Sequence, residues 1–529
     1  MMSANESILS VFDKSVEIGL GWKSDDTRAS GYRKCYFSEN AGAKIQTTFK
    51  GCAISLLRGS IWQSLPIVDG VDYDLPNHPN PLRPVEPIDT EKYIIKIDER
   101  PSYIINLGSE HLEIPLAENL SLENHTLQIE ATGPGQTTIL GFRILKSDYG
   151  SIQGKVNSEC ALYLNDIRVT LMKDGQFYDK RLARNPNTCD ILLWGLEPGN
   201  YDLTLEAIGW QPVVVNNLNV KANSITVFPN VKLVAEKIRR VAIPTKSKRT
   251  RFFRLVKFGH LDTWTQRNAE YLATLVQLTN FYDPDLLLIS NEANWQYVSG
   301  ALNKLNAPYM ITSGNHGLPG FETYYGEKLK KIDIGDITIV VYNAPWLGPV
   351  PEIEAAFNSS PQASFRILQG VESDIDQEWG KCLNLDIYLC AHAYDKSHAE
   401  TAPWLHLGKE FQVIDIDLET YQTVVIKSPH TGKTSREKYP ISREFPFEPI
   451  SFTPANNGEH TCVKAKVINP MLSDIKDNQL CFIMPKGKYS VSNGQIQKIS
   501  DTTKDNKCKV EVRFDILAST TLDIEIKVN

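Results

Sequence analysis

The sequence lacks the features that mark membrane proteins, secreted precursors and nucleic-acid-binding proteins. No apolar stretch approaches the ~20 residues of a membrane-spanning helix, and no transmembrane segment is expected. The N-terminal residues MMSANESILSVFDKS include neither a basic segment nor a long apolar run, so no signal peptide is readable there. Positive charge is not in excess, since 56 Lys and Arg stand against 63 Asp and Glu for a formal net charge of -7. Because phosphate backbones bind to cationic faces, nucleic acid is not an expected partner.

Cysteine is sparse, and its spacing is not that of a metal site. The nine cysteines include no CxxC pair and no Cys/His zinc pattern, which argues against a structural zinc. Two pairs, Cys35 with Cys52 and Cys160 with Cys189, fall inside single expected domains at separations that a β-sandwich would bridge. They are either disulfides or buried free thiols, and the odd total leaves at least one thiol free or paired between chains.

Length and composition indicate a globular protein of several domains. The 529 residues amount to about three to four domains of roughly 150 residues each. Apolar residues make up 42% and charged residues 22%, which excludes a wholly disordered chain. Residues 1–33 are polar with weak periodicity and predict an N-terminal arm.

Residues 34–148 alternate apolar and polar side chains over several short segments, as half-buried β-strands do. Three segments in this order, FKGCAISLLRG, YIIKID and NHTLQIEATGPGQTTILGFRI, resemble the jelly-roll module that precedes some carbohydrate esterases. The resemblance implies a carbohydrate-binding-like β-sandwich. Such modules either bind sugars or only pack against a neighbour, and packing is the preferred interpretation here.

Residues 149–236 form a second β-rich block, in which a tight Pro198-Gly199 turn separates two apolar runs. The segment GLEPGNYDLTLEAIGW is similar to carboxypeptidase-regulatory-like, or transthyretin-like, β-sandwich modules. That resemblance implies a rigid spacer without chemistry of its own. The basic residues that follow, at 237–251, are of a kind that binds anions, membrane surfaces or nucleic acid, but the acidic balance of the chain favours a solvated linker.

The periodicity changes after residue 251 to alternating short apolar runs and helical stretches. This order predicts a layered α/β domain over 252–440 whose first strands are parallel, with the reactive loops at the carboxyl ends of the strands. His260, Asn291 and His316 fall in those loops. The expected elements are strands at 252–258, 285–289 and 308–312 and helices at 266–278 and 297–305.

The segment Gly314-Asn315-His316 makes a resemblance to calcineurin-like metallophosphoesterases specific. The segment YYGEKLKKIDIGDITIVVYNAPW follows where that family has a buried hairpin, and DIYLCAHAY resembles the strand that enters its last histidine turn. The resemblance implies a four-layer α/β fold. It also implies two divalent cations about 3.5–4 Å apart that clamp a phosphate and activate a water.

The metal motifs of that family are degenerate in this chain. Aligned with the family, Phe258 stands at the first carboxylate and the neutral amide of Asn291 at the bridging carboxylate. Gln369-Gly370-Val371 stands where a lone histidine is expected, and Tyr394 replaces the last histidine. Neutral groups do not offset the repulsion between two dications, so no metal site is expected. The residues left to line a degenerate pocket are His260, Asn291, Asn315, His316, His392 and Tyr394.

Two acidic residues close to the replaced ligand positions leave metal binding as an alternative. Asp262 and Glu292 lie one or two residues away and would substitute only if their side chains point into the same pocket. No cofactor is therefore expected, and Mn, Fe or Zn would be bound only in an active site of that kind.

Residues 441–529 alternate cleanly again and predict a C-terminal Ig-like β-sandwich. The expected fold class is thus multidomain α/β plus all-β, with a metallophosphoesterase-like domain flanked by β-sandwich modules.

The expected function is that of a catalytically inactive, metallophosphoesterase-like protein with a structural, adhesive or glycan-associated surface role and a capacity for self-assembly. Its expected partners are glycans or further copies of the same chain, and domain analogy favours an extracellular or cell-surface location despite the unreadable signal peptide. One alternative is an active metal-dependent phosphoric ester hydrolase with an altered or mononuclear site and His316 as catalytic residue. Another is a metal-free anion- or glycan-binding protein in which Asn315, His316 and His392 hold the ligand.

Overall fold

The computed structural model of the chain is rich in β-strands and divides into two compact units. The first unit comprises Met1–Lys237 with Trp264–Glu270, and the second comprises Ile238–Thr263 with Tyr271–Asn529. No described helix is both long enough and apolar enough to cross a membrane. The structure describes residues 6–10, 13–25, 35–38, 40–58, 92–106, 113–133, 139–158, 164, 166–184, 188–243, 245–263, 266–293, 295–312, 321–342, 349–371, 375–390, 404–407, 411–427, 440–444, 449–501 and 507–529.

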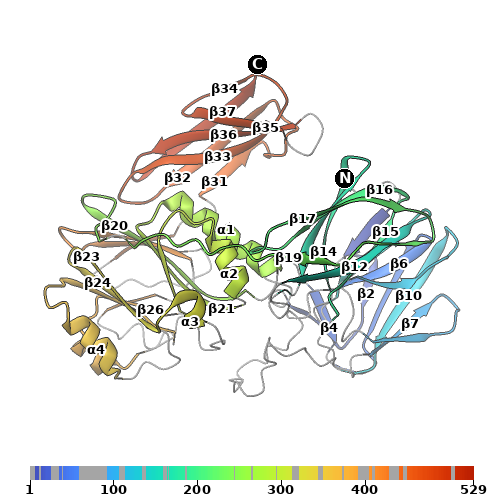
Figure 1. Cartoon of the computed structure of the whole chain (residues 1–529), viewed down its shortest axis with the longest axis horizontal. Coiled ribbons are helices and arrows are strands. Elements are labelled where there is room, and N and C mark those ends of the chain that lie inside the picture. The colour runs from blue at the N-terminus through green and yellow to red at the C-terminus, as the bar shows by residue number, and fades with distance from the viewer. Residues whose placement is uncertain are drawn as a thin grey trace. The chain divides into compact units, whose positions relative to one another are not determined.

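The first unit begins with an antiparallel β-sandwich (Figure 1). One sheet has the order β3-β4-β11-β6-β9 with β1 paired to β11, and the other has the order β2-β5-β10-β7-β8. Burial alternates residue by residue along β5, as expected for a strand with one face in the core. The strands are β1 (Glu6–Ser10), β2 (Val16–Ile18), β3 (Trp22–Asp25), β4 (Cys35–Ser38), β5 (Lys44–Lys50), β6 (Ala53–Arg58), β7 (Lys92–Ile97), β8 (Tyr103–Asn106), β9 (Glu113–Ala117), β10 (Asn124–Ala131) and β11 (Ile139–Leu145).

The described N-terminal residues, 6–10 and 13–25, belong to this sandwich and form strands where an arm was expected. β1 pairs with β11, β2 with β5 and β3 with β4, all antiparallel. Val16 and Trp22 are buried in the core, where the Trp22 ring stacks on Tyr93 at 6.0 Å between ring centroids. The arm prediction was wrong because the strands are only three to five residues long, too short for periodicity to be visible in the sequence.

A second β-sandwich completes the β-rich part of the first unit. Its sheets have the orders β15-β12-β18, with β19 paired to β12, and β14-β13-β16-β17. Gly199 follows the expected turn with a φ of 154°, a conformation that L side chains rarely adopt. The strands are β12 (Gly150–Ser158), β13 (Ile167–Lys173), β14 (Gln176–Ala183), β15 (Asp190–Leu196), β16 (Gly199–Glu206), β17 (Val213–Val220), β18 (Ile225–Val227) and β19 (Val231–Leu233).

Buried polar contacts join these two sandwiches. Glu113 on β9 is 8% exposed and accepts a hydrogen bond from Arg143 Nε at 2.9 Å. Arg181 Nη1 on β14 lies 3.6 Å from the same carboxylate, and Trp194 Nε1 on β15 donates to Glu118 Oε1 at 2.7 Å. The second module therefore packs on the first through paired charges, in keeping with the packing interpretation of the first module.

Cys52 and Cys189, one from each of the two cysteine pairs considered as disulfides, are free thiols. The Cys52 thiol donates to the Leu145 carbonyl oxygen at 3.3 Å, and Arg184 Nη2 lies 3.1 Å from Cys189 Sγ. Burial raises the pKa of the Cys52 thiol. The free-thiol interpretation thus holds for these two residues, while Cys160 lies outside the described part of the chain.

The second unit is built on two sheets of mixed direction. One has the order β22-β21-β20-β28-β29-β30 and the other β23-β24-β25-β26-β27. Their facing side chains form one apolar core cluster drawn from both sheets. The elements are β20 (Phe252–Thr263), α1 (Gln266–Tyr282), β21 (Leu286–Ala293), α2 (Trp295–Leu302), β22 (Tyr309–Thr312), α3 (Phe321–Tyr325), β23 (Leu329–Ile334), β24 (Ile337–Tyr342), α4 (Pro351–Asn358), β25 (Phe365–Gln369), α5 (Gln377–Cys382), β26 (Ile387–Leu389), β27 (Leu405–Leu407), β28 (Gln412–Asp417), β29 (Thr423–Lys427) and β30 (Pro440–Glu444).

Helices occupy the crossovers between parallel strands of these sheets. β20, β21 and β22 are parallel neighbours connected through α1 and α2, and β24, β25 and β26 are connected through α4 and α5. Such crossovers are almost always right-handed, so each pair of helices covers one face of its sheet. Phe357 of α4 and Trp379 of α5 accordingly pack against Leu368 and Tyr388, on the face of the second sheet away from the shared core. The expected strand–helix order and the hairpin of β23 and β24 are both present.

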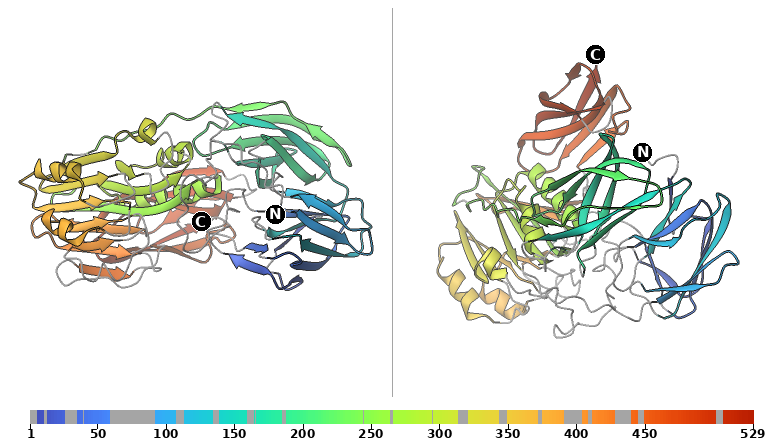
Figure 2. Two further views of the ribbon diagram at one scale, coloured as in Figure 1. Left: turned by 90° about the horizontal axis from the view of Figure 1, so that it is seen from below. Right: turned by 45° about the vertical axis from the view of Figure 1, so that its right-hand side comes forward.

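A third β-sandwich follows from β31 onwards, in red in Figures 1 and 2. Its sheets have the orders β31-β32-β37-β34 and β33-β36-β35, which fits the expected C-terminal β-sandwich. β30 pairs with β29, so the α/β sheet extends to Glu444, a few residues beyond the expected boundary. The strands are β31 (Ile450–Thr453), β32 (Cys462–Asn469), β33 (Ile475–Pro485), β34 (Tyr489–Val491), β35 (Gln495–Asp501), β36 (Lys507–Ile516) and β37 (Thr520–Val528).

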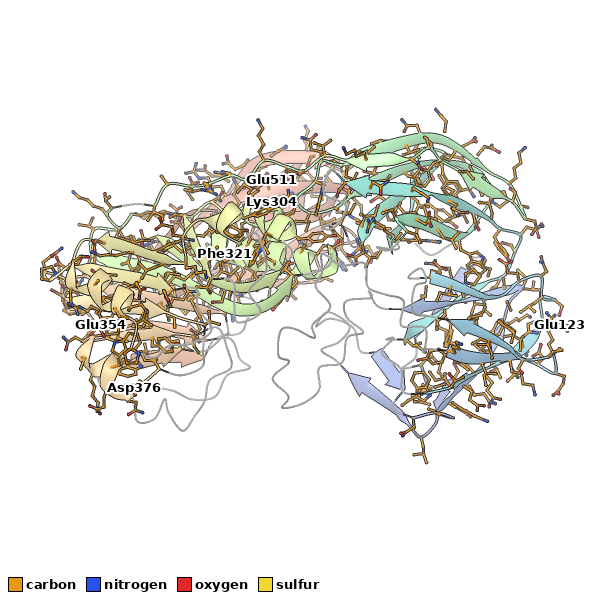
Figure 3. The ribbon with its side chains drawn as sticks, turned by 60° about the horizontal axis from the view of Figure 1, so that its bottom comes forward. Glu123, Lys304, Phe321, Glu354, Asp376 and Glu511 are labelled. Carbon is orange, nitrogen blue, oxygen red and sulfur yellow. The ribbon has the colours of Figure 1, made fainter. Side chains whose placement is uncertain are left out.

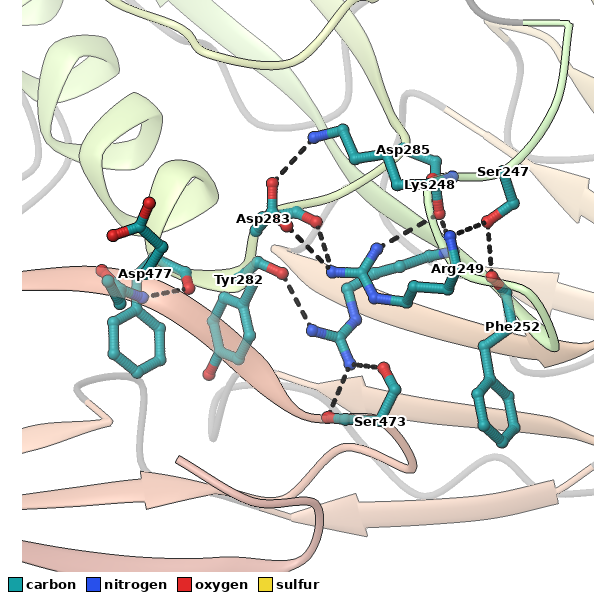
Figure 4. Close-up of polar contacts among 12 residues, drawn as sticks. Ser247, Lys248, Arg249, Phe252, Tyr282, Asp283, Asp285, Ser473 and Asp477 are labelled. Carbon is teal, nitrogen blue, oxygen red and sulfur yellow. Dashed lines mark hydrogen bonds and ion pairs between the residues drawn. The ribbon is translucent and has the colours of Figure 1, made fainter. Parts of the chain in front are cut away.

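The basic segment before β20 is solvent-exposed over Lys237, Arg239, Arg240 and Lys246, as a solvated linker would be, but its last residues form ion pairs. Lys248 Nζ lies 2.7 Å from Asp283, and Arg249 contacts both Asp283 and Asp285 (Figure 4). Asp285 has a fully buried side chain, so the partner cation is needed to offset the cost of its charge. The end of the segment is therefore fixed to the turn before β21.

Arg254, on β20 just after the basic segment, is completely buried in the second unit. Its guanidinium forms a two-point pair with Asp415, through Nε at 2.6 Å and Nη2 at 2.9 Å. Its Nη1 donates to the Tyr282 carbonyl oxygen at 2.9 Å, and its Nη2 donates to Ser473 Oγ at 2.6 Å. One side chain thus links β20, β28, the end of α1 and the loop that follows β32.

We expect Arg254→Met to lower the free energy of unfolding of the second unit by about 3–5 kcal/mol, because it leaves Asp415 buried without a cation. The double variant Arg254→Met, Asp415→Leu should lose less, since it leaves no charge unpaired. Urea unfolding of the full chain, followed by tryptophan fluorescence, measures both.

The matched control is Lys381→Met, which removes an exposed pair with Glu378. It should cost less than about 1 kcal/mol. If Arg254→Met were as mild as this control, the buried pair would not hold the unit together.

His125 in the first sandwich predicts a pH dependence, because both of its ring nitrogens face acceptors. Nδ1 lies 2.7 Å from Asp98 Oδ2, and Nε2 lies 2.8 Å from the Ser121 carbonyl oxygen. Burial works against the charged ring, but these two hydrogen bonds raise the pKa of His125 above its ordinary value of 6.5. The stability that it contributes is fully present below pH 6.5 and is lost as the pH rises through the raised pKa.

An NMR titration of the histidine ring resonances should therefore place His125 above 6.5. In Asp98→Asn, which removes the carboxylate, its pKa should fall relative to the parent. A His125 that titrates at or below 6.5 in the parent would show that the ring does not donate to both acceptors.

Candidate functional site

On five strands of the second unit, the row of apolar side chains that faces the other sheet (an apolar stripe) ends in a buried polar residue. Along β20 every second residue faces the other sheet, and the series Phe253, Leu255 ends in Lys257, which is completely buried. Lys257 pairs with Gln412, the first residue of antiparallel β28, whereas β20 and β21 continue beyond this level to Thr263 and Ala293. We call this set the polar end layer, and its members are Lys257 on β20, Ser290 on β21, Thr312 on β22, Gln369 on β25 and Gln412 on β28.

The polar end layer ties the two sheets together by hydrogen bonds that cross between them. Lys257 Nζ donates to the carbonyl oxygen of Cys390 at 2.6 Å, which connects β20 with the residue that follows β26. Gln369 Nε2 donates to Ser290 Oγ at 3.1 Å, which connects β25 with β21. Ser290 Oγ also lies 2.6 Å from Thr312 Oγ1 on the adjacent strand. The sheets are thus closed by polar bonds where their apolar contact ends.

Three amide atoms of this layer lack a hydrogen-bond partner among the described residues. They are Gln369 Oε1 and both Nε2 and Oε1 of Gln412. Gln369 is 0% exposed and Gln412 is 1% exposed. A buried amide group without a partner costs about 1–3 kcal/mol. A polar group that reaches this edge would gain those bonds, which makes the layer a candidate binding site.

The donor set of the layer does not fit a pair of divalent cations. Lys257 brings a positive charge with no free lone pair, and the other four side chains are neutral. Two dications held close together need carboxylates around them. Among the described residues no group of three or more His, Cys, Asp and Glu side chains is placed to hold a metal ion.

The alignment at the first carboxylate position requires a correction. Phe258 is 1% exposed and packs on Phe411 with ring centroids 5.7 Å apart. It alternates with Lys257, so it lies on the helix-covered face of β20 and not on the face between the sheets. The residue of β20 that faces the other sheet at the edge is Lys257, which the alignment passed over.

His260 and Asn291 lie within strands and not in the expected loops. β20 continues to Thr263 and β21 to Ala293, and the backbone of Leu261 pairs with that of Asn291. Asp262 and Glu292 are backbone partners on the same two strands. The side chains of these four polar residues are not among those described. Asn315, His316, His392 and Tyr394 lie outside the described residues altogether.

A recess lies at the amino-terminal edge of β25 and β26, away from the polar end layer. It is a groove of about 600 Å³ with Arg366, Lys381, Asp386 and Trp404 in its lining. Its charged groups are engaged within the protein, since Arg366 Nη1 donates to the Leu383 carbonyl oxygen and Asp386 accepts the backbone N–H of Arg366. We therefore place the candidate site at the polar end layer and not in this groove.

Comparisons with known proteins identify no family for the chain. No family model matches it, and no curated protein sequence matches it. Among solved structures, a family two carbohydrate esterase from Cellvibrio japonicus is similar at 11% identity, over 76% of this chain and 92% of that chain, with a TM-score of 0.20. An active-site mutant of a family two carbohydrate esterase from Clostridium thermocellum is similar at 10% identity, over 57% of this chain and 78% of that chain, with a TM-score of 0.16.

A two-domain esterase active on acetylated mannans is similar at 13% identity with a TM-score of 0.19. The likeness covers 27% of this chain and 37% of the esterase chain. This chain therefore spans little more than a third of the length of that esterase. TM-scores this low do not establish a shared fold.

We expect Phe258→Asp to destabilise the second unit by about 3–5 kcal/mol, because it removes a buried aromatic ring and places a carboxyl group in apolar surroundings. Phe258→Leu, which keeps the site apolar, should cost clearly less. Thermal melts with and without Mn²⁺ measure both variants. A melting temperature of Phe258→Asp that rises with Mn²⁺ would mean that position 258 faces a metal site after all.

Proposed function

We propose that the second unit carries a metal-independent binding domain of metallophosphoesterase-like architecture that does not hydrolyse phosphate esters. The observation that carries this proposal is the buried Lys257 in the middle of β20, on the face between the two sheets where the apolar contact ends. In a two-metal site this is where negative charge must gather. Lys257 supplies no negative charge to hold dications there, and its Nζ and the neutral side chains around it suit neutral or anionic polar groups.

The unpartnered amides support binding rather than a purely structural layer. Gln412 offers a donor and an acceptor, and Gln369 offers an acceptor, none of which is used among the described residues. Lys257 adds a cation beside Gln412 in the register of β20 and β28. A ligand with both hydroxyl and anionic groups would satisfy this set, which matches the metal-free anion- or glycan-binding alternative.

The β-sandwich modules extend the proposal to the whole chain. They make up the described part of the first unit almost entirely and the C-terminal part of the second. Together with the sequence resemblance to carbohydrate-associated modules, this organisation supports a structural, adhesive or glycan-associated role at a cell surface, with glycans or further copies of the chain as partners. No catalytic step is assigned to any module.

One observation favours the rival, an active hydrolase with a shifted metal site. Asp262 and Glu292 are backbone partners on adjacent parallel strands, so two carboxyl-bearing residues lie side by side just beyond the polar end layer. In that rival, His316 is the catalytic residue and Mn, Fe or Zn the cofactor. The same experiment decides between the two.

Elemental analysis of the purified chain should show no stoichiometric pair of divalent metals. Phosphomonoester and phosphodiester substrates should not turn over above background, with or without added Mn²⁺. The physical reason is the absence of charge-compensating carboxylates in the polar end layer.

Two variants control this test. His316→Ala should change neither metal content nor the background rate, and Asp262→Asn should behave in the same way. About two metal ions per chain, together with turnover that is lost in His316→Ala, would overturn the proposal in favour of the hydrolase.

A further inference from the structure

Two cations converge on the short helix α3 from different parts of the second unit. Arg240, in the basic segment before β20, donates from Nη2 to the Tyr324 carbonyl oxygen at 2.5 Å. Lys330, on β23, places its ammonium 5.3 Å from the centroid of the Phe321 ring. Phe321 is labelled in Figure 3. Both cationic side chains are thus held against the same five-residue helix.

Neither cation is neutralised by a described carboxylate. Lys330 has only its contact with Phe321, and Arg240 has only the hydrogen bond to Tyr324, among the described side chains and backbone. Their neighbour Lys331 differs in this respect, since it pairs with Asp333 at 3.1 Å. Two like charges held against the same short helix repel each other, and a shared counter-ion would relieve that repulsion.

The surroundings of Lys330 strengthen the need for an anion. Burial, followed by repulsion from Arg240, lowers the pKa of the Lys330 ammonium to about 8. Burial raises the pKa values of Tyr309 and Tyr325, and the positive charge of Arg240 opposes this effect at both tyrosines. The aromatic group under Lys330 is well packed, with Trp295 meeting Phe321 at 5.3 Å and Tyr325 at 5.6 Å between centroids. The cations are therefore held on a fixed, partly desolvated aromatic base.

We propose that Arg240 and Lys330 form a binding site for a doubly charged oxyanion, such as an inorganic phosphate or sulfate or a phosphate or sulfate group on a larger ligand. The guanidinium presents several N–H donors in a plane, which suits a tetrahedral oxyanion, and the ammonium adds a second charge. A dianion compensates both cations at once, whereas a carboxylate or chloride compensates one. None of these residues belongs to the polar end layer, so the two sites are tested separately.

Competitive acetylation with acetic anhydride at pH 8 tests the proposal on the full-length chain. This reagent is neutral and reacts with the unprotonated amine, so the rate reports the protonation of each lysine by peptide mass spectrometry. A bound dianion that raises the pKa of Lys330 by one unit should slow its acetylation about fivefold, because the neutral fraction falls from about a half to about a tenth. Inorganic phosphate and sulfate are the probes, with acetate and chloride at equal ionic strength as comparisons.

Lys331 is the internal control, because its charge is already paired with Asp333. Phosphate should slow Lys330 and leave Lys331 unchanged. In Arg240→Gln the protection by phosphate should be lost, and in Arg240→Lys, which keeps the charge without the planar donors, it should be weakened. A melting temperature for each variant shows whether it is folded.

Calorimetric titration with phosphate gives an independent measurement. Arg240→Gln and Lys330→Gln should each weaken binding at least tenfold, while Lys331→Gln should bind like the parent. Equal protection of Lys330 and Lys331, no protection of either, or unchanged affinity in folded Lys330→Gln would each overturn the proposal. If acetate protected as well as phosphate, the site would not select a dianion and the assigned ligand class would be wrong. Sulfated or phosphorylated sugars tested in the same assay separate a larger ligand from the free ion.

Discussion

The second unit depends on a buried ion pair between Arg254 and Asp415. The pair lies between the neighbouring strands β20 and β28, and the remaining donors of Arg254 reach the end of α1 and the loop that follows β32. A buried ion pair of this kind adds little to the free energy of unfolding compared with apolar side chains of similar size. Any arrangement of the strands that buries one charge without the other is, however, strongly destabilised. Shifting β20 against β28 by one residue would separate the two charges. We infer that the pair fixes the register of the central sheet, and through it the positions of Lys257 and Gln412.

That register determines what reaches the edge of the sheets. Because side chains alternate along a strand, the face that carries Phe253 and Leu255 must carry Lys257 next. By the same alternation, Ser290 follows Leu286 and Leu288 on the inner face of β21. Gln369 likewise follows Phe365 and Ile367 on the inner face of β25. Two hydrogen bonds then cross between the sheets, from Lys257 to the Cys390 carbonyl oxygen and from Gln369 to Ser290. A ligand at this edge would therefore contact groups that also hold the sheets together, and binding there should stabilise the second unit as a whole.

Much of the fold was predictable from the sequence, and the failures have physical causes. The strand–helix alternation after residue 251 predicted β20 to β22 with α1 and α2, because each run is long enough to show its period. The N-terminal strands were missed because they are three to five residues long and rely on pairing with distant segments. The end of the basic segment was taken for a linker because its acidic partners Asp283, Asp285 and Asp417 are remote in sequence. A run of basic residues in the sequence shows only that positive charges are present. The tertiary structure decides which acidic residues they pair with.

The residues of the candidate site were likewise predictable from the sequence only in part. The motif aligned Phe258 with a metal ligand, whereas the alternation of buried residues along β20 places Lys257, and not Phe258, on the face between the sheets. Counting alternate positions from Phe253 was possible from the sequence alone and would have found Lys257 and, from Leu286, Ser290. No sequence signal distinguishes Gln412, whose place depends on β28 running antiparallel to β20 from a segment more than a hundred residues away. In this unit the alternation along each strand decides which polar side chains meet between the sheets, and the spacing of a motif along the chain does not.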